Sequence, residues 1–498
     1  MIRFLVGLAT VEMSIRKEIY LVQKRKTEQT LIEFRGKLML HNNVIKFAQA
    51  NQDRFIEELK DLVRIPSISS SKDHVVDVHR CAEFLKDKML EIGLERAEIF
   101  ETQGHPVVYG EWLGAPEKPT IIIYGHYDVQ PVDPIDLWDT PPFEPEINDG
   151  RMYGRGTVDD KGQVYIHFKA IESWMKMHGS LPLNIKFIVE GEEEIGSENF
   201  EDFLKPNRKL LSSDYAVISD TPMIRKGYPS ICYGLRGLAY FQINLRGSKQ
   251  DLHSGSYGGS VINPIHALSK MLTQLKDENG RILIPGFYED VVDVSPGERK
   301  ALALLPFDED SYREEIGVKK LFRESGYSIL ENIWCRPTLD VCGIWGGFTG
   351  EGSKTIIPSE AHAKVSMRLV PDQTPEKIAE LFESYIHLIT PPEVEISIDR
   401  MHGGMPYLAD TNHQVFTAAI AALKKGFNAD AVFIREGGSI PIVRTFQETL
   451  NIPCLLLGFG LPNENAHAPN EWLDLENFKN GILSCIYLYE EISNLTSY

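Results

Sequence analysis

The residue types that could do chemistry here are histidines and carboxylates that follow short apolar runs. These runs read TIIIY, FIVE, YAVIS and LLLGFG. Runs of this length and composition are typical of buried strands. Because the carboxyl ends of parallel strands meet at one edge of a sheet, we expect the side chains after them to converge. These side chains are His126, Glu193, Glu194, Asp220 and His467.

A glycine-rich loop adds a further carboxylate to this set. It reads GRGTVDDKG over residues 154–162, and its glycines indicate a tight turn that brings Asp159 close to its neighbours. One open zinc site takes three protein ligands, whereas two histidines and three carboxylates suit two metal ions about 3.5–4 Å apart. The expected ligands are His126, Glu194, Asp220 and His467, with Asp159 shared between the ions.

Glu193 is the candidate general base of such a site. It stands beside the expected ligand Glu194 and is not needed as a ligand itself. A carboxylate in that place could take a proton from the water that the metal ions activate. The pattern therefore predicts metal-assisted hydrolysis.

Each of these motifs also has a purely structural explanation. A histidine and an aspartate two residues apart, as in HYD, are common in proteins, and DDKG alone would be a turn. The EGEEE run would be an acidic helix start, and SD after an apolar run would be a helix N-cap. Their occurrence together, each at the end of a predicted strand, favours the metal site.

The composition is that of a globular protein with an acidic surface. The 498 residues predict two to four domains. A hydrophobic content of 43% and a charged content of 25% are ordinary for a globular chain. The formal net charge of -19 argues against nucleic acid or an anionic membrane as a partner. We also find no apolar run long enough to span a membrane.

The cysteines and the N-terminus bear on the cellular compartment. Six cysteines lie far apart, without a CxxC pair, and are predicted to be reduced core thiols, which favours the cytoplasm. The segment MIRFLVGLATVEM faintly resembles a signal peptide, but Glu12 interrupts it and no A-x-A cleavage site follows. We therefore expect residues 1–45 to be an N-terminal extension of uncertain order.

The periodicity predicts an α/β fold with a mainly parallel sheet. Helical patterns alternate with apolar strand patterns from residue 51 to 219, which is typical of a parallel sheet with helices on both faces. The predicted helices cover 51–64, 75–92 and 163–178, and the predicted strands cover 97–100, 106–112, 120–124, 183–190 and 215–219. The same style returns near the C-terminus at 415–425, 454–460 and 475–492.

The pattern changes between these two parts. Alternating strands at 238–246 and 361–369, a strand at 393–398 and helices from 264 and 374 predict a small α+β layer of the split βαβ kind. The segment 277–352 has no clear pattern. We therefore predict a two-domain chain. Its parts are the extension 1–45, the metal-binding α/β domain at 46–234 and 403–498, and an inserted α+β domain at 235–402.

The motifs, in this order, resemble those of the M20 family of metallopeptidases. They read GHYDVQP, GRGTVDDKG, EGEEEIGSE, ISDT, DLHSG and ENAHAPNE. YGLRG, DLHSGSYGGSV and REGGSIPI are similar to the dipeptidase branch that includes cytosolic non-specific dipeptidase and the carnosinases. The resemblance covers the chain from about residue 45 to the end.

The resemblance implies how the metal ligands divide. One ion would be bound by His126 and Asp220, and the other by Glu194 and His467, with Asp159 bridging them. The ions are expected to be zinc, with manganese or cobalt as alternatives.

Other residues near the metals also gain a role from the resemblance. Asp128 would orient His126, and Glu193 would serve as general base and later as acid. In the family the peptide bond between Asp159 and Asp160 is cis.

The resemblance also implies a substrate site and a homodimer. His253 would cross from the partner subunit to stabilise the oxyanion, and Arg368 would bind the substrate's C-terminal carboxylate. Without the resemblance, His253 would be a surface histidine and Arg368 a solvent-facing side chain. The inserted domain would act as a lid and form the dimer. The remaining residues expected to line the site are Thr355, His402 and Ser439.

The implied activity is hydrolysis of the peptide bond in dipeptides or other small peptides. An N-acyl-amino-acid deacylase of the same family is an alternative, because Ala468 stands where the dipeptidases usually have a small polar residue. A non-catalytic metal-binding protein is a second alternative. The presence of both Glu193 and Asp159 speaks against it.

Overall fold

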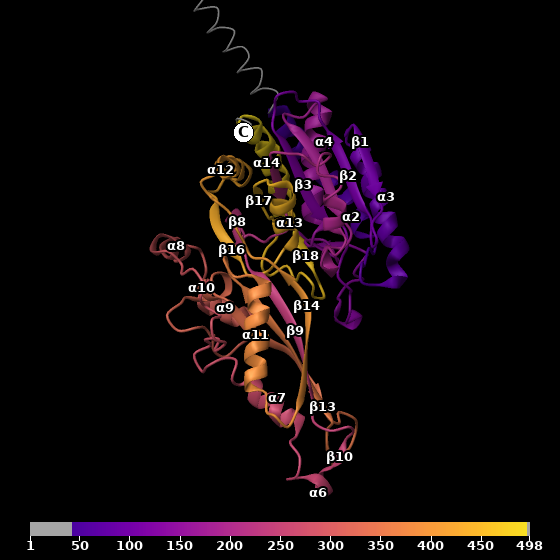
Figure 1. Cartoon of the computed structure of the whole chain (residues 1–498). Coiled ribbons are helices and arrows are strands. Elements are labelled where there is room, and N and C mark those ends of the chain that lie inside the picture. The colour runs from indigo at the N-terminus through magenta and orange to yellow at the C-terminus, as the bar shows by residue number, and fades with distance from the viewer. Residues whose placement is uncertain (1–41, 496–498) are drawn as a thin grey trace, which may run out of the picture.

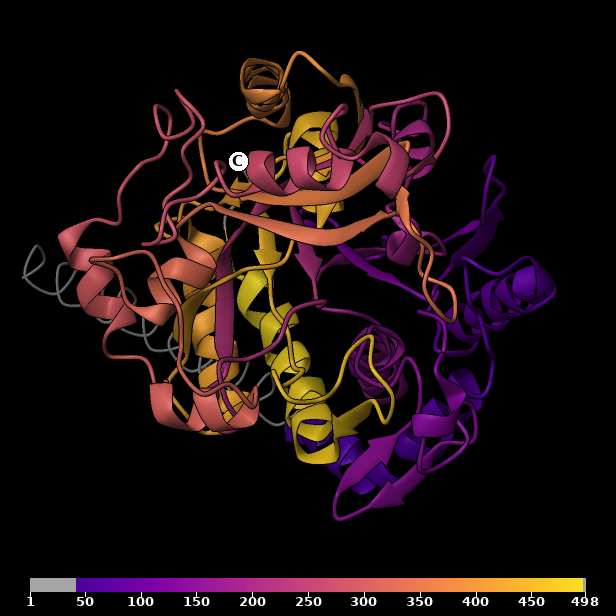
Figure 2. The same ribbon diagram turned by 90° about the horizontal axis from the view of Figure 1, so that it is seen from below.

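The computed structural model describes residues 42–495 as a mixed α/β structure. The predicted N-terminal extension, residues 1–45, therefore lies almost entirely outside the described residues. Figure 1 shows a large helix-covered sheet at one end of the molecule and a smaller sheet at the other, and Figure 2 shows the molecule from below. The larger sheet carries the strand ends from which the sequence predicts a metal site.

The larger sheet has nine strands, in the order β1-β2-β6-β3-β7-β17-β8-β15 with β16 paired to β8. Its central strands β6, β3, β7 and β17 run parallel, as predicted, whereas β1, β2 and β15 pair antiparallel. The strands are β1 (Arg96–Phe100), β2 (Val107–Trp112), β3 (Thr120–His126), β6 (Asn184–Glu190), β7 (Tyr215–Ile218), β8 (Ser230–Leu235), β15 (Tyr407–Leu408), β16 (Val432–Glu436) and β17 (Cys454–Leu456).

Helices cover both faces of this sheet because its central strands are apolar on both sides. In β3, Ile121 and Ile123 pack into the core under α2, α3, α4, α12 and α14, while Ile122 and Tyr124 pack into the core under α5 and α13. The helices are α2 (Gln52–Val63), α3 (Val75–Glu91), α4 (Lys161–His178), α5 (Phe200–Leu204), α12 (Gln414–Phe427), α13 (Pro441–Leu450) and α14 (Leu475–Ser493).

The smaller sheet is antiparallel, in the order β11-β13-β9-β14, and α7 and α11 pack against one of its faces. Along the chain its elements follow as strand, helix, strand, strand, helix, strand, which confirms the predicted split βαβ layer. They are β9 (Gly237–Arg246), α7 (Pro264–Leu272), β11 (Thr338–Gly346), β13 (Glu360–Leu369), α11 (Pro375–Ile389) and β14 (Glu395–Gly404).

The remaining elements are short. The segment 277–352, which has no clear sequence pattern, contributes the edge strand β11 and three short helices. The domain boundaries at 46–234, 235–402 and 403–498 stay a prediction. The short elements are α6 (Ser254–Tyr257), α8 (Pro296–Leu302), α9 (Glu309–Glu315), α10 (Ile329–Trp334), β4 (Glu146–Asn148), β5 (Arg151–Tyr153), β10 (Leu252–His253), β12 (Ile356–Ile357) and β18 (Trp472–Asp474).

All six cysteines are free thiols, as predicted, and five of them are buried. Cys342 differs from the prediction of a core thiol, because it is exposed on the edge strand β11. Across residues 42–495, no helix combines the length and the apolar character that crossing a membrane requires.

Candidate metal centre

Three of the five predicted ligands lie at or just after the carboxyl ends of neighbouring strands, whereas Asp159 and His467 lie in longer loops. His126 ends β3, and Glu193 and Glu194 begin a short 3-10 helix just after β6. Asp220 follows β7, which pairs with β3 on its other side. Parallel pairing therefore brings three chain segments to one edge of the sheet, as expected from the sequence.

The structure brings the ligand candidates into two groups of three. The ligand atoms within each group lie within 4.8 Å of one another. Asp159 joins the groups, because its Oδ1 is 3.0 Å from Nε2 of His126 and its Oδ2 is 2.9 Å from Nε2 of His467. One group is His126, Glu193 and Asp220, and the other is Asp159, Glu194 and His467.

This grouping matches the geometry that a bridging carboxylate requires. Asp220 Oδ1 lies 3.8 Å from His126 Nε2, and Glu194 Oε2 lies 3.1 Å from His467 Nε2. The two carboxylates thus flank different histidines, while Asp159 contacts both histidines. Glu193 lies beside His126 and Asp220. Its carboxylate is therefore close enough to take a proton from a water held between them.

Asp128 contacts residues of both groups. It is fully buried, and its Oδ1 lies 3.4 Å from Nδ1 of His126. Its carboxylate also accepts the backbone N–H groups of Glu193 at 3.2 Å and Glu194 at 3.1 Å. The resemblance implied only the contact with His126. The second contact fixes the turn that carries Glu193 and Glu194.

The carboxylates of the centre repel one another. Burial and the charge of Asp159 raise the pKa of Glu194 to about 7. Burial also raises the pKa of Glu193 well above its usual value, with Asp220 and Glu194 adding to the effect. Divalent cations would relieve this crowding of acidic groups, so the donor set fits them.

The two histidines balance only part of this charge. Hydrogen bonds with Asp159 and Glu194 raise the pKa of His467 to about 11. Burial alone would raise the pKa of Asp159, but hydrogen bonds with His126 and His467 outweigh it and hold the pKa below its usual range. Imidazole and carboxylate ligands accept zinc, manganese or cobalt.

The backbone around His126 allows no larger residue before it. A Cβ on Gly125 would lie 2.1 Å from Cγ2 of Val164 and 2.6 Å from Oδ2 of Asp160. The peptide bond between Asp159 and Asp160 is cis, as the resemblance implied. Strand β3 and the start of α4 therefore pack directly against each other beneath the centre.

The predicted substrate residues fall into separate places within one chain. Arg368 on β13 donates a hydrogen bond from Nη1 to Oγ of Ser439 at 2.9 Å, which brings these two together. His253 and Thr355 are neighbours, because the N–H of Ser254 donates to the carbonyl of Thr355 at 3.0 Å. Figure 1 shows α6 and β10 at the far end of the smaller sheet, away from β3.

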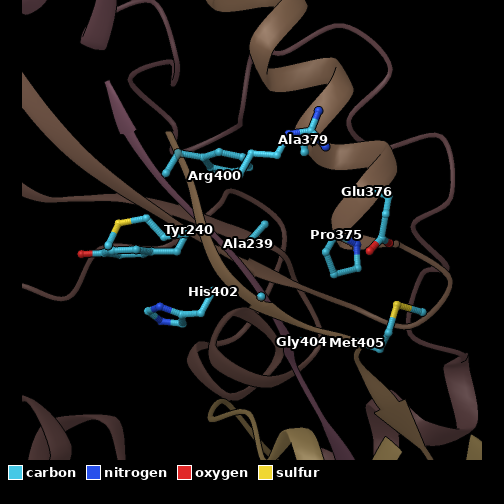
Figure 3. A pocket seen from close by; sticks show the side chains of 12 residues that line it. Ala239, Tyr240, Pro375, Glu376, Ala379, Arg400, His402, Gly404 and Met405 are labelled. Carbon is cyan, nitrogen blue, oxygen red and sulfur yellow. The ribbon is translucent and has the colours of Figure 1, made fainter. Parts of the chain in front are cut away.

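His402 lies beside a hollow of about 270 Å³ between β14, β9 and α11. Its ring stacks on Tyr240, with 5.1 Å between the ring centroids (Figure 3). Pro375 and Glu376 of α11 line the opposite side. The sequence analysis did not identify Tyr240 as a site residue. The alternating pattern of its strand predicts one solvent-facing side, and Tyr240 lies on that side.

Comparison with known proteins identifies the family. The model of "Peptidase family M20/M25/M40" matches residues 122–490. The chain is 34% identical to Cys-Gly metallodipeptidase dug1 of Schizosaccharomyces pombe, over 88% of this chain and 96% of that protein. It is 32% identical to Beta-Ala-His dipeptidase of Mus musculus, over 89% of this chain and 93% of that protein.

The solved structures agree with this result. The crystal structure of human carnosine dipeptidase 1 superposes with a TM-score of 0.82 at 31% identity, covering 92% of this chain and 99% of that chain. The chain therefore belongs to peptidase family M20/M25/M40. The predicted resemblance to the dipeptidase branch is confirmed, and the chain is a peptidase.

Proposed function

We propose that this chain hydrolyses the peptide bond of dipeptides with two divalent metal ions. The observation that carries the proposal is the pair of ligand groups joined by Asp159. The relatives named above are metallodipeptidases or dipeptidases, which supports this substrate class over an N-acyl amino acid or a non-catalytic role. Zinc is the proposed metal, with manganese or cobalt as alternatives.

The proposed ligands are the members of the two groups other than Glu193. His126 and Asp220 would hold one ion, and Glu194 and His467 would hold the other, with Asp159 as the shared ligand. Asp128 keeps His126 and the turn of Glu193 and Glu194 in place. When bound, the two ions polarise the scissile carbonyl and lower the pKa of the attacking water.

Glu193 moves the proton in this scheme. Its carboxylate accepts a proton from the attacking water, whose oxygen forms the new bond to the carbonyl carbon. Glu193 then returns the proton to the amine nitrogen as the carbon–nitrogen bond breaks. Burial and the neighbouring carboxylates Asp220 and Glu194 raise the pKa of Glu193, which favours uptake of this proton.

The substrate's C-terminal carboxylate is proposed to bind Arg368. Burial lowers the pKa of this guanidinium. Its Nη1 donates a hydrogen bond to Oγ of Ser439, so the side chain is oriented before the substrate binds. His402 is proposed to line the same face of the smaller sheet beside Tyr240.

His253 and Thr355 are proposed to reach the site of a partner subunit. Their place at the far end of the smaller sheet supports this, because neither lies near its own chain's ligands. The inserted part would then serve as both lid and dimer interface, and His253 would stabilise the oxyanion. The six free cysteines support a cytoplasmic location.

A substrate panel tests the proposal. Metal-stripped protein is assayed with free-amine dipeptides and with N-acetyl amino acids, before and after zinc or manganese is restored. We expect metal-dependent cleavage of dipeptides. Cleavage of only the N-acetyl amino acids would move the chain to the deacylase alternative. Cleavage of neither, with two ions bound, would favour the non-catalytic alternative.

A further inference from the structure

Glu471 is a buried carboxylate in the same loop as His467. The side chain has no exposed surface, and the buried Arg155 pairs with it, its Nη1 lying 2.7 Å from Glu471 Oε2. Ionised groups are costly to bury, so a paired glutamate at such a place needs several further hydrogen-bond donors. None of the roles described so far uses either residue.

The donors all come from the glycine-rich loop that leads to Asp159. Oε2 of Glu471 also accepts the N–H of Gly156 at 3.0 Å. Oε1 accepts the N–H of Val158 at 2.9 Å and the N–H of Asp159 at 3.2 Å. A single carboxylate therefore holds the backbone of the loop at three places, the last of them the bridging residue itself.

Gly156 makes this arrangement feasible. Its φ of +87° lies in the left-handed region, which lets its N–H and those that follow turn toward one acceptor. A Cβ at this position would lie 2.7 Å from Cγ1 of Val129. The loop is thus wrapped around the Glu471 carboxylate.

The same residue also ties the loop to the segment of His467. The N–H of Gly154 donates to the backbone carbonyl of Glu471 at 2.9 Å, and the next residue, Trp472, pairs with Tyr153 in the β18–β5 ladder. Glu471 stands four residues after His467. The two loops that supply Asp159 and His467 are therefore fastened to each other at this point.

We propose that Glu471 and Arg155 are positioning residues that set the place of the bridging carboxylate. A bridging ligand must reach two ions at once, so a small displacement of Asp159 weakens both sites, whereas a displaced terminal ligand weakens one. This inference rests on the proposed two-metal function and deepens it, because it names what holds the shared ligand relative to His467.

The test uses Glu471→Gln and measures metal affinity directly. The amide keeps the size of the side chain but replaces one acceptor oxygen with a donor that faces N–H groups, and it leaves Arg155 without its counter-charge. Affinity is read by competition between the full-length protein and a zinc chelator. We expect both ions to be bound about 10- to 100-fold more weakly. The KM for a dipeptide at saturating zinc should change far less, since Arg368 and Ser439 are untouched.

Glu172→Gln is the matched control. Glu172 is also buried, and it accepts hydrogen bonds from Lys169 at 2.8 Å and from Arg54 at 2.7 Å in the second half of α4. The control therefore loses the same kind of ion pair at a place that touches no ligand loop. Thermal unfolding is expected to show lower stability in both variants, while metal affinity falls only in Glu471→Gln.

Equal metal affinity in Glu471→Gln and Glu172→Gln would overturn the inference. If Glu471→Gln does not fold, Arg155→Lys decides, because it keeps the charge but not the geometry of the guanidinium. We expect weaker metal binding there, and unchanged binding would again overturn the inference. If the unaltered chain binds two ions and cleaves dipeptides while the variants match the control, only this inference fails. If the unaltered chain does neither, the proposed function fails.

Discussion

Asp128→Asn tests how far one buried carboxylate organises the centre. In the parent chain, the Asp128 carboxylate accepts two backbone N–H groups, at 3.2 Å from Glu193 and 3.1 Å from Glu194. The same group lies 3.4 Å from Nδ1 of His126. Asparagine has almost the same size but only one acceptor oxygen, and its amide nitrogen would face an N–H donor.

The expected loss of unfolding free energy follows from the loss of one acceptor oxygen. One of the two N–H groups loses its partner, and an unsatisfied buried donor costs about 1–3 kcal/mol. The turn of Glu193 and Glu194 is only partly buried, so we expect the lower end, about 1 kcal/mol, in the unfolding free energy of metal-free protein. Metal affinity should fall by about 10- to 100-fold, because ligands on both groups lose their support.

Two assays measure these effects. Urea unfolding of metal-free protein gives the change in stability, and chelator competition gives the change in metal affinity. The control is Asp73→Asn, which changes an exposed carboxylate on the surface. If Asp128→Asn matched this control in both assays, the assignment of Asp128 as the support of both ligand groups would be refuted.

Three further perturbations probe the base, the substrate carboxylate and a buried histidine. Glu193→Gln should lower kcat by about 10²- to 10⁴-fold with both ions still bound, because no group accepts the proton, as steady-state kinetics with metal analysis would show. Arg368→Met should cost about 1.5–3 kcal/mol in kcat/KM, mainly through KM, because a charge-assisted hydrogen bond is lost. His167 is buried between Tyr489 and Ser219, and burial lowers its pKa to about 3. Since the unfolded chain binds a proton below about pH 6.5 and the folded chain does not, the contribution of His167 to stability is complete above that pH and falls toward pH 3. In urea unfolding, His167→Gln should flatten this pH dependence.

Each of these perturbations has its own control. Near-normal turnover of Glu193→Gln with two ions bound would remove it as the base. Arg368→Met should not change the KM of a dipeptide amide, which lacks the carboxylate, and an equal loss with that substrate would contradict its role. For His167→Gln, the exposed His79→Gln variant is the reference, and identical pH profiles would count against the argument.

The convergence of the candidate ligands was predictable because it depends on local patterns. Short apolar runs locate β3, β6 and β7, and parallel pairing then brings the residues after them to one edge. The apolar run TIIIY, bounded by Gly125, predicts a strand that ends close to His126. The assignment of Asp159 as shared ligand needed only its glycine-rich loop and the number of ligands.

Other features depend on contacts that periodicity does not report. Strand β11 was missed because a register shift between Val341 and Gly343 breaks the alternation, and most of its residues after Leu339 are exposed. The hydrogen bond from the N–H of Glu193 to Asp128 joins residues 65 apart in the sequence. The hydrogen bond from the N–H of Asp159 to Glu471 joins residues more than 300 apart. Such long-range hydrogen bonds appear only once the strands are paired.

The central claim is that two ions, joined by Asp159, make this chain a dipeptidase. Zinc titration of metal-stripped protein, with metal content and dipeptide hydrolysis followed together, tests it most directly. We predict that hydrolysis reaches its maximum when two ions per chain are bound, and that Asp159→Asn binds neither ion at the parent affinity. Full hydrolysis in metal-free protein, or a plateau at one ion per chain, would contradict the claim.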